Sequence, residues 1–413
     1  MQALSDRTAS FTDSVIRRMT RISNQYGAVN LSQGFPDFDP PKPILDRLSQ
    51  VAYEDYHQYS ITWGAQDFRE ALAKKQSHFM GRDIDPNGEI VVTCGSTEAM
   101  MAAMMTVTNP GDKVVIFSPF YENYGADTIL SGAEPIYVPL NPPTFDFDRE
   151  VLEAAFRDND PKAIVLCNPS NPCGKVFTRE ELTFIADLCK KYDAYCITDE
   201  VYEHIVYAPH EHVYMATLPG MFERTISCSS LSKTYSITGW RLGYTIAPAE
   251  ITERIKKVHD FLTVGAAAPL QEAIIPGLNF GQDYYDALQA EYTHKKDLFL
   301  KGLDDLKIVH NLLRQVAREL AVGQRALAAP VGAEHDVLND VHAADKAPFL
   351  QYGCFFISLY HIRQKIASPN GRKVSPPALP RRSALKNRPR RFICERIQKK
   401  PAKRLDKRGG LRI

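Results

Sequence analysis

Lys233 and Arg241 lie close together in the run SLSKTYSITGWRLGY, and their side chains offer complementary chemistry. A lysine amine attacks a carbonyl only when it is neutral, so a catalytic lysine needs burial or a neighbouring cation. An arginine guanidinium binds a phosphate dianion with paired donors, and Ser230 adds a hydroxyl nearby. A lone lysine in a loop is more often solvated. The prediction of a covalent amine beside an anion site therefore depends on the neighbouring motifs.

A second candidate for phosphate binding is the turn formed by Gly95, Ser96 and Thr97. These residues follow the apolar run EIVVTC and begin the predicted helix TEAMMAAMM. The first N–H groups and the dipole of that helix would face an anion. Alone, such a turn is more often an ordinary helix cap. Together with Lys233 and Arg241, it favours a phosphate cradle.

The remaining candidates match the other parts of pyridoxal 5′-phosphate. Asp199 ends an apolar run, where its charge is costly unless a cation such as a protonated pyridine nitrogen pairs with it. The alternative is a structural ion pair or a cap. Asn171 and Tyr202 can donate to a ring phenolate, although Asn-Pro pairs usually mark only a turn. Tyr121 could stack on the ring or belong to the core, and Tyr59 is a further candidate.

Short β-branched runs alternate with amphipathic stretches from about residue 90 to 245, and this pattern predicts the fold class. The predicted strands are EIVVTC, DKVVIF, EPIYVPL, AIVLC, AYCITD and TISCSS. Such alternation indicates an α/β fold with a mostly parallel sheet that helices cover on both faces. Ligands in these folds bind beyond the carboxyl ends of the strands, where most of the candidate residues fall.

The composition bounds the location and the partners of the chain. Of 413 residues, 44% are hydrophobic and 24% are charged, enough for a large core. Residues 372–413 carry a formal charge of +14 and residues 1–371 carry −13. The acidic body argues against a general nucleic-acid binder, and the tail alone is a candidate for polyanion contact. The eight cysteines have no zinc spacing, and no apolar run predicts a membrane span or a secretory signal. We expect a soluble, cytoplasmic protein.

The motifs resemble those of the class I and II aminotransferases, which depend on pyridoxal phosphate, and look most like the kynurenine, glutamine and methionine branch. The resemblance covers about residues 10 to 308. It implies fold type I, with a large domain built on a mostly parallel sheet and a smaller α/β domain from both chain ends. The motifs that carry it are NLSQGFPDFDPP, HQYSITWGAQDFREALA, TCGSTEAM, SPFYENYGAD, NPSNPCGKVFT, ITDEVYEHIVY, SLSKTYSITGWRLGY and LTVGAAAPLQEA.

The resemblance also implies a role for each candidate residue. Lys233 would hold the cofactor covalently and move a proton between the substrate Cα and the cofactor. Asp199 would bind the pyridine nitrogen, with Asn171 and Tyr202 at the phenolic oxygen and Tyr121 stacked on the ring. The remaining cofactor-binding residues are Gly95 in the cradle turn and the phosphate ligands Ser96, Thr97, Ser230 and Arg241.

The implied substrates are an amino acid and a 2-oxo acid, which exchange an amino group in a ping-pong reaction. Gly34 and Asn171 would bind the substrate, and Tyr59 would cross the interface of a homodimer to the partner's phosphate. Two alternatives stay open at this point. One is a cysteine-conjugate β-lyase on the same fold, and the other is a cofactor-binding product without activity.

The second alternative arises from the C-terminal part of the sequence. After about residue 308 the family motifs end, including the arginine that pairs with the substrate carboxylate, and only Arg391 with Phe392 has a faint likeness to it. We interpret this part as out-of-frame translation or a divergent terminus. The expected organisation is an N-terminal arm with part of the small domain, a large cofactor-binding domain, an atypical remainder of the small domain and a basic, poorly ordered tail, at residues 1–45, 46–275, 276–371 and 372–413.

Overall fold

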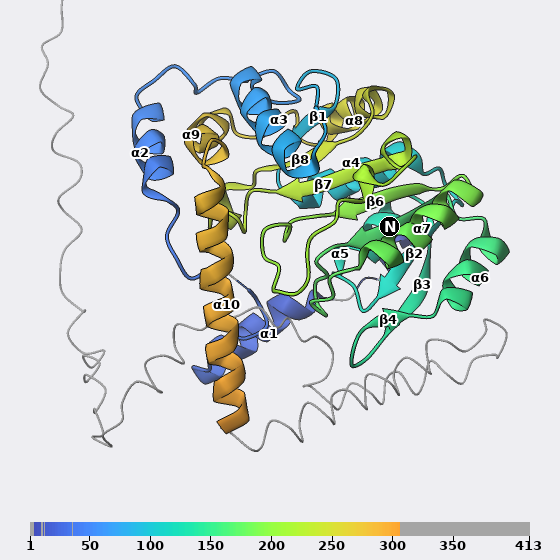
Figure 1. The fold of residues 1–413 in the computed structure, drawn as a ribbon. Helices are drawn as coiled ribbons and strands as arrows, with labels where there is room; N and C mark the ends of the chain where they lie inside the picture. Colours follow the sequence, from blue (N-terminus) through green and yellow to red (C-terminus); the bar gives the residue numbers. More distant parts are fainter. Residues whose placement is uncertain (1–3, 10, 12, 35, 306–413) are drawn as a thin grey trace, which may run out of the picture. The chain divides into compact units, whose positions relative to one another are not determined.

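The fold is built on an eight-stranded sheet that runs through the described part of the chain (Figure 1). The computed structural model describes residues 4–9, 11, 13–34 and 36–305. The strand order is β1-β8-β7-β6-β5-β2-β3-β4, and β8 and β4 run antiparallel to their neighbours. The strands are β1 (Ile90–Thr93), β2 (Lys113–Ser118), β3 (Glu134–Asn141), β4 (Asp146–Phe147), β5 (Ala163–Cys167), β6 (Tyr195–Asp199), β7 (Thr225–Ser230) and β8 (Gly243–Ile246).

Both faces of the sheet are buried, because successive side chains of a strand point to opposite faces. In β2, Val114 and Ile116 pack with the helices α4 (Ser96–Val107), α5 (Asn123–Leu130) and α8 (Ala249–Leu262). Val115 and Phe117 point the other way, into a core shared with α6 (Arg149–Asn159) and α7 (Arg179–Lys191). The continuous apolar runs of the sequence reflect this double burial.

The remaining helices contact different parts of the fold: residues 6–8 lie against α5, whereas Met215 belongs to the core shared with α6 and α7. Helices α3 and α9 contribute to a third core together with Ile90, Val92 and Tyr244. At the end of α3, Gly81 is in the left-handed conformation with nothing within 4 Å of an added Cβ. These helices are α1 (Val15–Tyr26), α2 (Lys42–Val51), α3 (Gln66–Met80), α9 (Ala268–Leu278) and α10 (Gln282–Asp305), with 3-10 helices η1 (Asp6–Thr8), η2 (Met215–Thr217), η3 (Phe222–Arg224) and η4 (Thr238–Trp240).

Helix caps explain where several of these elements begin. Thr178 and Glu181 form a reciprocal capping box at the start of α7, and the Asp148 side chain accepts two N–H groups at the start of α6. Among the described residues, helix α4 has Gly95 as its N-cap and no side-chain cap hydrogen bond, and the same lack of a side-chain cap holds for α2, α3, α5, α8 and α9. The first N–H groups of α4 therefore have no acceptor from an N-cap side chain.

The α/β fold and the predicted strands are confirmed. The six predicted runs correspond to β1, β2, β3, β5, β6 and β7, whereas β4 and β8 were not among them. The predicted division near residues 45 and 275 stays a prediction. The predicted features after residue 305, including Arg391, the frame hypothesis and the basic tail, lie outside the described residues.

Candidate active site

The candidate residues gather at the carboxyl edge of the parallel strands. Asp199 is the last residue of β6 and Ser230 the last of β7. Gly95 lies two residues after the end of β1 and Lys233 three residues after the end of β7, while Asn171 lies in the loop after β5. Because β1, β5, β6 and β7 run in the same direction, their ends share one edge of the sheet (Figure 1).

Gly95, Arg241 and Gly243 form a cradle at the start of α4. Gly95 has a positive φ of 82°, and a Cβ added there would lie 2.3 Å from Nη2 of Arg241. A Cβ on Gly243 would lie 2.3 Å from the carbonyl carbon of Gly95, so both positions require glycine. Nη2 of Arg241 donates to Oγ1 of Thr97 at 3.5 Å. The Arg241 guanidinium thus lies against the first turn of α4, which begins at Ser96 and, within the described part of the chain, has no side-chain cap. This arrangement suits an anion.

Asp199 lies on the buried side of the site. Its Oδ2 accepts a hydrogen bond from Oη of Tyr124 at 2.7 Å, and its Oδ1 accepts one from the N–H of Val201 at 3.2 Å. Burial raises the pKa of the Asp199 carboxyl, although these two hydrogen bonds and the charge of Lys233 oppose the change. A buried carboxylate is stabilised by a cationic partner, and a pyridinium N–H would provide one.

Lys233 lies beside two other candidates. Its Nζ donates to the carbonyl oxygen of Gly34 at 3.0 Å and lies 6.0 Å from the ring centroid of Tyr202. Its charge also acts on Asp199. The structure therefore brings the predicted amine, the predicted substrate-binding glycine and the predicted phenol donor together across a long separation in sequence.

Tyr121 lies between the acidic and the basic side of the site. Burial raises the pKa of its phenol to about 12, the charges of Asp199 and Glu122 act in the same direction, and Arg241 opposes them. Its ring is 5.8 Å from that of Tyr124, edge to face. The charges of both Asp199 and Arg241 therefore act on the Tyr121 phenol.

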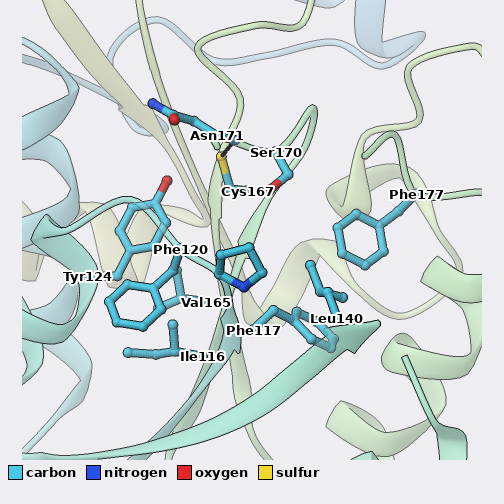
Figure 2. Close-up of a pocket in the computed structure, with 11 residues that line it drawn as sticks. Ile116, Phe117, Phe120, Tyr124, Leu140, Val165, Cys167, Ser170, Asn171 and Phe177 are labelled. Atoms are coloured by element: carbon cyan, nitrogen blue, oxygen red, sulfur yellow. Dashed lines mark hydrogen bonds between the residues drawn. The ribbon is translucent and has the colours of Figure 1, made fainter. Parts of the chain in front are cut away.

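Asn171 lines a small apolar cavity behind the site (Figure 2). Its backbone N–H donates to Sγ of Cys167 at 3.3 Å, shown as a dashed line in Figure 2. The cavity measures about 10 Å³, close to the smallest volume that holds one water molecule. Tyr124 borders it as well, and Phe177 lies on the other side in this view. The cavity is too small for a cofactor.

Within the part of the chain that the structure describes, Ser230 and Tyr59 form no side-chain hydrogen bond with the other candidate residues. Ser230 is buried, and its Oγ accepts the N–H of Ser232 at 3.0 Å, so the hydroxyl also shapes the turn that leads to Lys233. The Tyr59 side chain is 87% exposed, and the structure of the single chain does not bring it to the other candidates.

Tyr124 is the residue at the site that the sequence reasoning missed. It lies three residues after Tyr121 in SPFYENY, across the turn that leads into α5, and the two rings are in edge-to-face contact. This spacing was the available signal. Its partner Asp199 lies 75 positions further along the chain, so the contact itself leaves no local pattern.

Together these residues fit pyridoxal 5′-phosphate. The glycine cradle with Arg241 suits its phosphate, and buried Asp199 suits its ring nitrogen. Lys233 offers the amine for its aldehyde, beside Tyr202.

Comparison with known proteins decides the family. Residues 26–314 match the model of aminotransferase class I and II. This chain belongs to the class I and II aminotransferases. It transfers amino groups with pyridoxal 5′-phosphate, within EC 2.6.1, and its sheet is that of fold type I. The predicted family, fold, cofactor and reaction class are thereby confirmed.

Relatives of this aminotransferase occur in a mammal and in bacteria. It is 38% identical over 305 residues to kynurenine–oxoglutarate transaminase 3 of Mus musculus. That alignment covers 70% of this chain and 67% of the relative. Methionine aminotransferase of Escherichia coli (strain K12) is 34% identical, over 71% of this chain and 76% of the relative. The structure of N-succinyldiaminopimelate aminotransferase from Mycobacterium tuberculosis superposes with a TM-score of 0.71 at 33% identity, covering 73% and 79% of the two chains.

Proposed function

We propose that this aminotransferase carries its cofactor on Lys233 and uses the same amine to move the reacting proton. The observation that supports this most is the environment of the Lys233 Nζ. This atom donates to the Gly34 carbonyl and lies over the Tyr202 ring, and its charge acts to lower the pKa of Asp199. An amine in this place adjoins the substrate-binding glycine and the acid at once. Pyridoxal phosphate supplies an electron-accepting ring when bound.

Each of the other residues holds or orients a group. Asp199 would keep a proton on the ring nitrogen, because its buried carboxylate needs a cationic partner. Asn171 and Tyr202 would donate hydrogen bonds to the phenolic oxygen. Arg241 would hold the phosphate with charge-assisted hydrogen bonds, together with the hydroxyls of Ser96, Thr97 and Ser230 and the backbone at Gly95. Tyr121 would pack on the ring and exclude water.

Lys233 is well placed for proton transfer between the substrate Cα and the cofactor. Because its backbone lies shortly after β7, the Lys233 amine would stay close to the Gly34 carbonyl during the reaction. A positioned base of this kind contributes about 10² to 10⁴-fold to a proton transfer. Gly34 and Asn171 would bind the amino acid and then the 2-oxo acid, which gives the ping-pong order.

The names of two relatives suggest substrates for the first assays. Kynurenine–oxoglutarate transaminase 3 and methionine aminotransferase are both about equally similar to this chain. We therefore select kynurenine and methionine as donors and 2-oxoglutarate as acceptor for the first assays. A purified chain that converts neither donor, although it holds the cofactor, would favour the inactive alternative.

A homodimer would place Tyr59 in the partner's site. Tyr59 and Ile61 are exposed, and so are Phe261 and Val264 at the end of α8. The two segments adjoin each other, because the Thr62 carbonyl accepts a hydrogen bond from His259. They form one exposed apolar surface, of the kind that mediates association between copies of a chain. Sedimentation should show a dimer, and Phe261→Ser should weaken it.

A cytoplasmic location is part of the same proposal. All six cysteines among the described residues are free thiols, and four of them are buried, as is usual in a reducing compartment. Within the described residues, the helices are all too short or too polar to pass through a lipid bilayer. Fractionation of the source cells would test the location directly.

The decisive experiment locates the cofactor on the chain. Borohydride reduction of the purified, yellow protein followed by peptide mapping should place the label on Lys233. Lys233→Ala should abolish amino-group transfer and the label while retaining some noncovalent binding. The matched control is Lys190→Ala, a half-exposed lysine that pairs with Asp187 on α7. A label on another lysine would refute the assignment.

A further inference from the structure

His259, on α8, is fully buried, and both of its ring nitrogens face oxygen atoms. Nδ1 lies 2.7 Å from Oε1 of Glu98, and Nε2 lies 2.8 Å from the carbonyl oxygen of Thr62. A carbonyl oxygen can only accept a hydrogen bond, so Nε2 carries a proton. The protonation of Nδ1 depends on the state of Glu98.

Glu98 is held as a carboxylate by donors on both of its oxygens. Oε1 accepts a hydrogen bond from Oγ1 of Thr263 at 2.6 Å, and Oε2 accepts one from the backbone N–H of Cys94 at 2.6 Å. Burial raises the pKa of Glu98, but the hydrogen bonds from His259, Thr263 and Cys94 outweigh it, so the pKa is lowered. With a carboxylate at Oε1, Nδ1 of His259 also carries a proton.

The surroundings of His259 therefore favour an imidazolium. Burial lowers its pKa, but the hydrogen bond and charge of Glu98, the Thr62 carbonyl and the charge of Asp260 raise it above the ordinary value. Cys94 is the other ionisable group nearby, and its thiol has a raised pKa because of burial and Glu98. His259 and Glu98 are thus a buried ion pair whose hydrogen-bonding groups are satisfied.

The two ends of this pair reach two parts of the proposed cofactor site. Glu98 is the third residue of α4 and binds the N–H of Cys94, which directly precedes the cradle glycine, Gly95. On the other side, Thr62 lies three residues after Tyr59, in the loop that pairs with β1 through the Trp63 carbonyl. Glu98 and His259 are 161 positions apart, so this ion pair joins separate segments of the chain.

We propose that His259 is a positioning residue that fixes the phosphate cradle of its own site and, through Thr62, the loop that presents Tyr59 to the partner's site. This inference rests on the proposed function, in which both Tyr59 and the cradle bind phosphate. Each subunit would then use one imidazolium to order donors for two phosphates.

Two substitutions separate the two hydrogen bonds of His259, which are called here the arm to Glu98, from Nδ1, and the arm to Thr62, from Nε2. His259→Asn keeps an amide donor near the position of Nδ1, so it retains the arm to Glu98 and loses the arm to Thr62. His259→Gln keeps a donor near the position of Nε2, so it retains Thr62 and loses Glu98. The readout is the ratio of dissociation constants for pyridoxal and pyridoxal 5′-phosphate with the full purified chain, since only the latter carries the phosphate.

We expect His259→Gln to weaken binding of the phosphorylated aldehyde about tenfold, from loss of one charge-assisted hydrogen bond, and to change pyridoxal binding by less than about twofold. His259→Asn should also weaken the phosphorylated aldehyde, but through Tyr59. In a Tyr59→Phe background, the effect of His259→Asn should therefore vanish and that of His259→Gln should persist.

The possible outcomes are distinguishable. If both variants weaken the two aldehydes equally, or leave the ratio at its original value, His259 has only a structural role or none, and the inference is overturned. If the effect of His259→Asn persists without the Tyr59 hydroxyl, the arm to the partner's site is wrong. If the unmodified chain shows no label on Lys233, the proposed function fails independently of His259.

Discussion

Oη of Tyr124 lies 2.7 Å from Oδ2 of Asp199, and both side chains are buried at the carboxyl end of β6. Burial raises the pKa of the Asp199 carboxyl, and the hydrogen bond from Tyr124 opposes this change. Burial raises the pKa of the Tyr124 phenol well above its ordinary value, and the charge of Asp199 acts in the same direction. The phenol thus stays protonated and donates to the carboxylate.

Tyr124→Phe removes this hydrogen bond and keeps the ring. A hydrogen bond to a charged group contributes about 1.5 to 3 kcal/mol, so we expect amino-group transfer to slow by about tenfold or more. Stopped-flow measurement of the half-reaction with one amino acid would test this. Tyr195→Phe is the control, since Tyr195 begins the same strand and stacks under Lys162, 5.5 Å from Nζ. Equal rates in the two variants would contradict the role of Tyr124.

Gly95→Ala should weaken cofactor binding through Arg241. The added Cβ would lie 2.3 Å from Nη2 of Arg241, which forces the guanidinium away from the cradle. We expect affinity for pyridoxal 5′-phosphate to fall by about tenfold or more, as for Arg241→Ala, because charge-assisted hydrogen bonds are lost. Fluorescence titration of the cofactor-depleted chain would measure it.

The control for this variant is Gly111→Ala. Gly111 has a similar positive φ of 89°, but an added Cβ would meet nothing within 4 Å. In both variants an alanine must adopt a positive φ, which destabilises the folded chain by about 1 to 2 kcal/mol, so both should lose thermal stability. Only Gly95→Ala should lose cofactor affinity. If Gly111→Ala loses it equally, the effect comes from general destabilisation.

Asp127 should make the chain less stable as the pH rises. Burial and the charge of Asp199 raise the pKa of this carboxyl from 3.8 to about 7, and its Oδ2 is buried without a hydrogen-bond partner. The folded chain therefore keeps a proton that the unfolded chain has lost. Stability must fall as the pH rises from about 4 to about 7 and then level off.

Asp127→Asn removes this cost. We expect its free energy of unfolding to exceed that of the unmodified chain by about 2 to 4 kcal/mol at pH 8, with no gain below pH 4. Urea denaturation at several pH values would show this. Asp158→Asn, at an exposed residue that pairs with Arg157, should change stability by less than about 0.5 kcal/mol at every pH. A gain that does not depend on pH would contradict the titration of Asp127.

The sequence could predict the elements of this fold better than the contacts between them. The apolar, β-branched run of β5 can be recognised locally because it is buried on both faces, whereas β8, Gly243–Ile246, begins with a glycine, which weakens a strand pattern. Lys233 and Arg241 could be selected from their motif. The contact of Lys233 with Gly34 spans 199 positions, and that of His259 with Glu98 spans 161. Such pairs depend on how the elements pack, and no short-range period of the sequence encodes them.

Lys75 and Glu203 form a buried ion pair that anchors α3 to the turn carrying Tyr202. Their atoms are 3.2 Å apart, and each side chain is only 2% exposed. Oε2 of Glu203 also accepts a hydrogen bond from the Tyr214 hydroxyl at 2.7 Å. Burial raises the pKa of Glu203, but Lys75 and the adjacent donors lower it well below the ordinary value. The carboxylate is therefore charged and depends on its partner.

Lys75→Met should destabilise the chain by about 3 to 5 kcal/mol, because it leaves the Glu203 charge buried without its cation. Adding Glu203→Gln to Lys75→Met should restore a large part of this loss, since the double variant buries no net charge. The control is Lys190→Met, which breaks the exposed pair with Asp187 and should cost less than about 1 kcal/mol. Urea denaturation of five chains gives these values: the unmodified chain, Lys75→Met, Glu203→Gln, the double variant and the control. A double variant that is as unstable as the two single changes combined would show that the pair is not coupled, and the anchoring of Tyr202 would then need another cause.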